Sequence, residues 1–133
     1  MQRKKANPVK SSGYSTFRKF AKFYYICNMV VTFEEDYLKS LYEEGVSPDK
    51  KHRFQPDIIT RYQKVINFLK DSSSIEDLWK IKSLRYEVLQ GDKAGRSAVS
   101  VNMQYRVEFT VTKTEAEPIL TICNILELNN HYK

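Results

Sequence analysis

Four residues in the second half of the chain have side chains that could together cleave RNA without a metal ion. Glu87 could take the proton of a ribose 2′-hydroxyl, and His131 could give a proton to the departing 5′-oxygen. Arg106 could hold the crowded, negatively charged phosphate, or it could instead be a structural ion-pair partner of Glu108 or Glu87. Tyr132 could donate a hydrogen bond or stack on an unpaired base. These four residues are the predicted catalytic set.

The alternation of residue types predicts that Glu87 and Arg106 share one face of a sheet. Four segments alternate, at residues 84–90, 96–102, 105–113 and 118–126, with turn sequences between them, which predicts an antiparallel meander. Arg85 has the same parity as Glu87 and joins this face. The residues predicted to pack on the helices are Tyr86, Val88, Val99, Val101, Val107, Phe109 and Val111.

Helical periodicity precedes the strands. A first strand is predicted at residues 29–33, a helix over 34–44 that ends at Gly45, and a second helix that begins near Pro56. The predicted fold class is α+β: an N-terminal strand and two helices packed on one face of a three- to four-stranded antiparallel sheet, with the other face open.

Length and charge predict one domain with a basic extension. The chain has 133 residues, enough for a single core. Seven of its 22 basic residues lie in residues 1–28, which contain no acid and which we expect to be disordered or partly helical. The remaining residues, 29–133, are close to neutral and form the predicted domain.

Within residues 29–133, basic side chains are concentrated near Glu87 in the sequence. Either these residues form a phosphate-facing patch or they are solvated positions on the sheet, and the composition leaves both interpretations open. The concentrated residues are Lys80, Lys82, Arg85, Lys93, Arg96 and Arg106.

The remaining features indicate an ordinary cytoplasmic protein. Cys27 and Cys123 are too few for a disulfide framework, and Cys123 lies in an apolar run typical of a reduced core residue. No apolar stretch has the length of a membrane span. The placement of His52 and His131 does not predict a metal site, and we interpret His52, in the basic segment DKKHR, as a solvated residue.

Three segments resemble the RelE superfamily of bacterial toxins, and most closely its HigB and YoeB branches. They are FEEDYLKSLYEEG, SLRYEVLQGDKAGRSAVSVNMQYRVEF and the tail NNHYK, in that order and spacing. The resemblance covers residues 29–133. It implies a RelE-like fold, a ribosome-dependent messenger-RNA endonuclease that uses no metal or other cofactor, and a cognate antitoxin that holds the toxin inactive.

The resemblance also implies roles for individual residues. Glu87 lies eight residues before Gly95, at the distance of the YoeB general base, and Arg106 in QYRVEF matches the arginine of the YoeB pattern. His131 and Tyr132 match a terminal His-Tyr pair that supplies the general acid and a phosphate or base contact. The RNA-binding residues predicted beside them are Lys82, Arg85, Gln90, Lys93 and Arg96.

The chain departs from its relatives at positions that matter for RNA. Gln90 stands where many relatives have lysine, so that one phosphate contact is missing or has moved to Lys93. HigB relatives have histidine where Glu87 stands, and the segment RSAVS offers only Arg96 where relatives carry an aromatic and further basic residues. These departures indicate weaker activity or a different set of contacts with the RNA.

Two other functions fit the same resemblance. One branch of the superfamily poisons DNA gyrase by protein contact without cutting RNA, and a degenerate toxin could remain only as an antitoxin-binding scaffold. The antitoxin is expected to carry a helix-turn-helix DNA-binding part. The chain shows no recognition helix, so it is not expected to bind operator DNA unaided.

Overall fold

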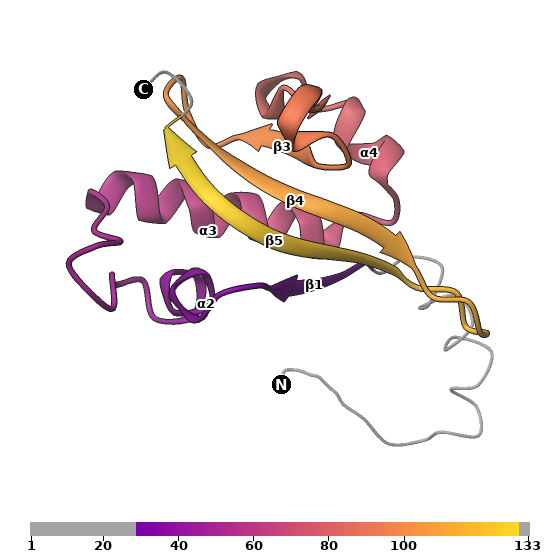
Figure 1. Cartoon of the computed structure of the whole chain (residues 1–133), viewed down its shortest axis with the longest axis horizontal. Helices are drawn as coiled ribbons and strands as arrows, with labels where there is room; N and C mark the ends of the chain where they lie inside the picture. Colours follow the sequence, from indigo (N-terminus) through magenta and orange to yellow (C-terminus); the bar gives the residue numbers. More distant parts are fainter. Residues whose placement is uncertain (1–28, 131–133) are drawn as a thin grey trace.

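A twisted five-stranded sheet forms the centre of the computed structural model, which describes residues 29–130 (Figure 1). The predictions for residues 1–28 and for His131 and Tyr132 lie outside the described residues. The strand order is β1-β5-β4-β3-β2. The strands are β1 (Met29–Phe33), β2 (Glu87–Val88), β3 (Ser97–Ser100), β4 (Tyr105–Lys113) and β5 (Thr121–Asn130).

The α+β class is confirmed, and the sheet has one feature that the predicted architecture lacks. The four C-terminal strands pair in antiparallel fashion, as predicted, but β1 joins the same sheet as an edge strand parallel to β5. Met29 pairs with Thr121 and Phe33 with Ile125. The sheet is therefore mixed, with five strands rather than three or four, because the N-terminal strand pairs with the last strand instead of packing on a face.

Helices cover one face of this sheet and bury its core. The helical elements are α2 (Asp36–Glu43), α3 (Pro56–Asp71), α4 (Ile75–Trp79) and the short 3-10 helices η1 (Lys82–Leu84) and η2 (Gly91–Lys93). In Figure 1, α3 crosses behind the sheet. Its buried stripe runs from Ile58 to Leu69 and packs with Val107, Phe109 and Ile125 in one cluster. None of the helices in residues 29–130 is long and apolar enough to cross a membrane.

One of the packing predictions is wrong. Val88 is 58% exposed, although alternation assigned it to the helix face. The reason is that β2 is an edge strand of two residues, whereas α2 and α3 lie against β1 and β5 near the opposite edge. Cys123 is a buried free cysteine, as predicted, and burial raises the pKa of its thiol to about 11.

A buried hydrogen bond joins the two longer helices. The hydroxyl of Tyr62, which is fully buried in α3, donates to the carbonyl of Leu38 in α2 at 2.7 Å. We expect Tyr62→Phe to lower the free energy of unfolding in urea by about 1 kcal/mol, because the carbonyl loses a buried partner. Tyr42→Phe is the control, since its bond to Asn67 at 2.6 Å is exposed and should contribute less. Equal losses would contradict this prediction.

Candidate active site

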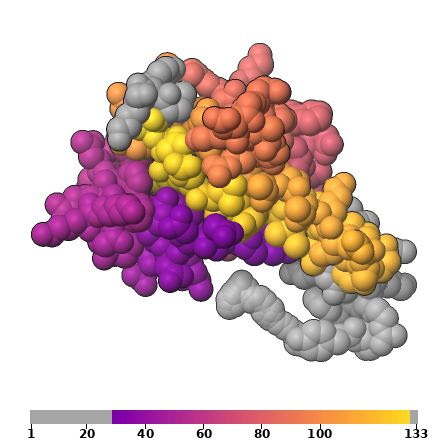
Figure 2. All heavy atoms as spheres, viewed as in Figure 1, coloured from indigo at the N-terminus to yellow at the C-terminus, as the bar shows by residue number. Residues whose placement is uncertain are grey.

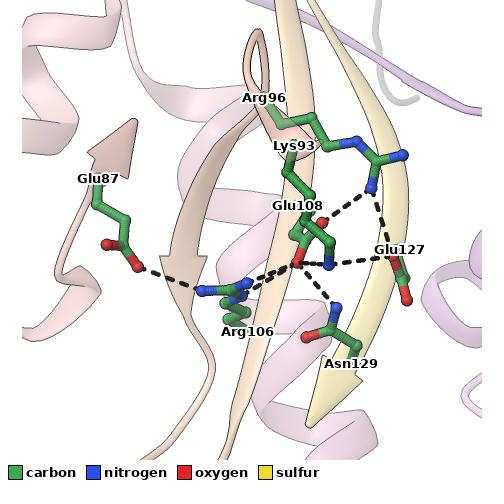
Figure 3. Close-up of polar contacts among 7 residues, drawn as sticks. All are labelled: Glu87, Lys93, Arg96, Arg106, Glu108, Glu127 and Asn129. Carbon is green, nitrogen blue, oxygen red and sulfur yellow. Dashed lines mark hydrogen bonds and ion pairs between the residues drawn. The ribbon is translucent and has the colours of Figure 1, made fainter. Parts of the chain in front are cut away.

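Glu87 and Arg106 meet on the sheet face opposite the helices, as alternation predicts. Nη1 of Arg106 donates to Oε1 of Glu87 at 3.4 Å (Figure 3). Both residues line a hollow of about 230 Å³ together with Arg85. Glu87 pairs with Ala98 of β3. Ser100, two residues further along β3, pairs with Arg106 of β4. Small side chains on β3 therefore leave room for Arg106 to reach across that strand.

Glu108 lies at the centre of the polar cluster on this face and is fully buried. Its Oε2 accepts hydrogen bonds from Nε of Arg106 at 3.1 Å, from Nζ of Lys93 at 2.8 Å and from Nδ2 of Asn129 at 2.8 Å. Its Oε1 accepts one from Nη1 of Arg96 at 2.9 Å. The carboxylate therefore binds three cations that come from two parts of the chain (Figure 3).

Two opposing effects set the ionisation of Glu108. Burial raises the pKa of its carboxyl group, and the hydrogen bonds from Lys93, Asn129 and Arg96 lower it further than burial raises it. The pKa falls from 4.5 to about 2. Glu108 is therefore a carboxylate at any physiological pH, and it acts as a fixed anchor for the surrounding cations.

The turn between β2 and β3 carries two of those cations. Gly91 has φ of 67° and Gly95 has φ of 94°, conformations that a residue with a Cβ adopts only with strain. Between them, η2 folds the segment back so that Lys93 and Arg96 reach Glu108. The sequence GDKAG thus does more than reverse the chain, because its backbone sets the positions of both side chains.

The predicted phosphate-facing patch is consequently more neutral than its sequence indicates. Lys93, Arg96 and Arg106 each contact Glu108 within 3.1 Å. Glu127 adds a carboxylate 3.4 Å from Arg96 and 4.0 Å from Lys93. These cations therefore form an organised polar surface and are not a set of unpaired charges.

Of the other predicted RNA-binding residues, Arg85 lines the hollow beside Glu87, whereas Lys82 and Gln90 do not. Lys82 and Gln90 are exposed, at the start of η1 and just before η2. Arg85 has left-handed backbone geometry with φ of 48°, and its Nη2 donates to Sδ of Met103 at 3.2 Å. This conformation explains why β2 begins only at Glu87, since a residue with positive φ interrupts an extended strand.

The end of β5 runs beside Arg106. Asn129 pairs with Arg106, and Asn130, the last described residue, pairs with Tyr105. His131 and Tyr132 follow Asn130 directly in the sequence but lie outside the described residues, so their predicted roles stay predictions.

His52 does not behave as the solvated residue that its basic segment indicates. Its ring stacks on the ring of Tyr37, with centroids 3.6 Å apart and planes 7° from parallel. Asp49 accepts the backbone N–H of His52 at 2.9 Å and lies 3.2 Å from its Nδ1. The hydrogen bond from that backbone N–H lowers the pKa of Asp49, so the carboxylate that holds the ring stays ionised.

Glu108 belongs to this site although the sequence predicted it only as a possible ion-pair partner of Arg106 and not as a site residue. It has the same parity as Arg106 in β4, which was the available indication that it faces the site. Within residues 29–130, no group of three or more His, Cys, Asp or Glu side chains is placed to hold a metal ion.

Comparisons with known proteins found a matching family model and solved structures of similar fold. Residues 31–120 match a family model described as the RelE-like toxin of the type II toxin-antitoxin system HigB. Among solved structures, the YoeB/ParE toxin from Agrobacterium tumefaciens is similar over 78% of this chain and 100% of its own, with 14% identity and a TM-score of 0.50. YafQ from E. coli strain BL21(DE3) is similar over 78% and 94%, with 10% identity and a TM-score of 0.49. No curated protein sequence matches the chain.

Proposed function

Because the chain belongs to the HigB family of RelE-like toxins from type II toxin-antitoxin systems, we propose that it is an endoribonuclease that cuts messenger RNA on the ribosome. Membership in a type II toxin family implies a cognate antitoxin as its partner. The observation that carries the nuclease proposal is the meeting of Glu87 and Arg106, 3.4 Å apart, at a hollow on the sheet face that the helices leave uncovered.

The proposed reaction uses the ribose of the message as the nucleophile. Glu87 takes the proton of the 2′-hydroxyl, and the 2′-oxygen forms a bond to phosphorus. The bond between phosphorus and the 5′-oxygen breaks, and His131 gives its proton to that oxygen. The products are a 2′,3′-cyclic phosphate and a free 5′-hydroxyl, so protons and electrons balance without a metal ion or another co-reactant.

Arg106 is proposed to stabilise the charge that develops on the phosphate. Glu108 accepts from Nε and Nη2 of Arg106 at 3.1 and 3.0 Å, which fixes the plane of the guanidinium group. Nη1 remains directed toward Glu87. A donor held in place before the substrate arrives stabilises the transition state without reorganising during the reaction.

His131 is supported as the acid by its position in the chain. It follows Asn130, and one residue spans about 3.8 Å between Cα atoms. Asn129 lies opposite Arg106, and His131 is two residues further along the sequence. Histidine has an ordinary pKa of about 6.5, which makes the protonated form available near neutral pH.

The test is expression of the wild type and of His131→Ala in a bacterium without the antitoxin, with growth and new 5′ ends on translated messages followed together. We expect the wild type to arrest growth and create new ends, and the variant to do neither. Arrest by both proteins without new ends would overturn the nuclease proposal and favour a toxin that acts by protein contact. No arrest by the wild type would favour a scaffold without activity.

A second assay tests the chemistry directly. Purified protein, ribosomes and a programmed message should give cleavage that a single 2′-deoxy substitution before the cut abolishes, because the nucleophile is then missing. Cleavage that survives this substitution would exclude attack by the 2′-oxygen.

A further inference from the structure

A second, larger hollow adjoins the proposed cleavage site. It has a volume of about 890 Å³ and lies between α2, the loop before α3 and the last residues of β5. In Figure 2 the yellow atoms of β5 are visible in the middle of the surface. The indigo and purple atoms of β1 and α2 lie on one side of them, and the orange atoms of the segments that precede β5 lie on the other. Its walls include Tyr37, His52, Tyr105, Arg96 and Asn129. Arg96 and Asn129 also contact Glu108, which in turn binds Arg106, so the two sites are connected through Glu108.

His52 provides a flat aromatic surface in this hollow. One face of its ring is covered by Tyr37, which is itself only 7% exposed. The side chain of His52 remains 23% exposed, and it lines the hollow. Because Asp49 holds both its backbone and its Nδ1, the ring is already ordered before a ligand binds, and stacking on it would cost little conformational entropy.

The side-chain oxygen of Asn129 is a hydrogen-bond acceptor that receives no hydrogen bond within the described part of the chain. Nδ2 of Asn129 donates to Glu108, whereas Oδ1 is buried. A buried acceptor without a partner costs free energy, so a small shift of the Asn129 side chain that brings Oδ1 to an N–H or O–H group of a ligand is favourable.

The charge of the hollow favours a neutral ligand over a phosphate. Lys51 and Arg96 are opposed by three carboxylates, and Arg96 already contacts two carboxylates. An aromatic surface, a buried acceptor and an excess of one carboxylate together fit a nucleobase, which is uncharged and has a flat π-face and exocyclic donors. The opposing carboxylates are Glu34, Glu35 and Glu127.

We infer that this hollow binds one unpaired nucleobase of the RNA, next to the nucleotide whose phosphate lies at Glu87 and Arg106. The inference rests on the proposed nuclease function. Asn129 and Arg106 pair directly across β5 and β4, and the Cα atoms of such pairs lie about 4.5–5.5 Å apart. The base stacks on His52, and its N–H group donates to Oδ1 of Asn129 once that side chain shifts toward the hollow, so that cleavage depends on the base at that position.

The binding test uses the full chain and a 2′-O-methyl RNA hexamer that contains one 2-aminopurine, because methylation blocks attack and stacking quenches 2-aminopurine fluorescence. We expect saturable quenching by the wild type and a dissociation constant about 5- to 100-fold higher for His52→Ala. His52→Phe should restore the affinity, since it keeps an aromatic face. Lys50→Ala, in the same loop but outside the hollow, is the matched control.

The outcomes separate this inference from the nuclease proposal. Quenching that depends on His52, without any cleavage of ribosome-bound messages, supports the base site and overturns the nuclease. Cleavage with the same affinity and the same base beside the cuts in the wild type and His52→Ala overturns the base site alone. Absence of quenching by the wild type also overturns it. Circular dichroism of each variant checks that the fold is intact.

Discussion

Glu87→Gln is expected to reduce message cleavage on the ribosome by about 10²- to 10⁴-fold, the range typical of a lost general base. Glutamine has nearly the same shape as glutamate but cannot accept the proton of the 2′-hydroxyl. Glu87 is exposed and contacts Arg106 at 3.4 Å, so its removal should leave the free energy of unfolding nearly unchanged. The measurement is the single-turnover rate of cleavage of a programmed message.

The same variant distinguishes a catalytic role from a role in binding. In Glu87→Gln, Nη1 of Arg106 loses its carboxylate partner and becomes more available to the phosphate. We therefore expect a lower kcat with an unchanged or lower KM. A higher KM with an unchanged kcat would show that Glu87 only helps to bind the message. Glu76→Gln, an exposed residue of α4, is the control and should have no effect on either constant.

Local patterns were sufficient for much of the fold. The apolar residues at helical spacing and the proline in the first turn were enough to predict α3. The strand Tyr105–Lys113 was predicted with its observed bounds. Alternation also placed Glu87 and Arg106 on one face. Pairing of β1 with β5 was not predictable in this way, because it joins residues about 90 positions apart and has no local signature.

The chemistry of the site was harder to predict because it depends on contacts between distant segments. Glu108 in isolation resembles an ordinary solvated strand residue. It is buried only because the turn carrying Lys93 and Arg96 folds over β4 and because Asn129 reaches it from β5. Likewise, nothing near His52 in the sequence indicates that Tyr37, on a helix before it, covers its ring.

Glu108→Gln is expected to destabilise the protein by about 2–4 kcal/mol at pH 7, because three cations would then surround a neutral amide. The size of the side chain is retained, so the loss reports on charge and hydrogen bonding. Lys93, Arg96 and Arg106 keep partial access to water, which holds the loss below that of a fully buried broken pair. Urea unfolding at pH 7 gives the value. Glu127→Gln is the matched control: its ion-pair distances are 3.4 and 4.0 Å and its side chain is 41% exposed, so we expect a loss below about 1 kcal/mol.

The pH dependence of unfolding provides an independent test of the same residue. The pKa of Glu108 is about 2 in the folded protein and 4.5 as the ordinary value, so the unfolded chain binds the proton more readily. The stabilisation is therefore complete above pH 4.5 and is lost as the pH falls toward 2, by about 3 kcal/mol in total. Glu108→Gln should lose this part of the pH dependence, while Glu127→Gln should retain it. If Glu108→Gln showed the same fall in the free energy of unfolding between pH 4.5 and 2 as the wild type, the carboxylate of Glu108 would not be the anchor of Arg106. Some other contact would then have to hold the guanidinium group in place before RNA binds.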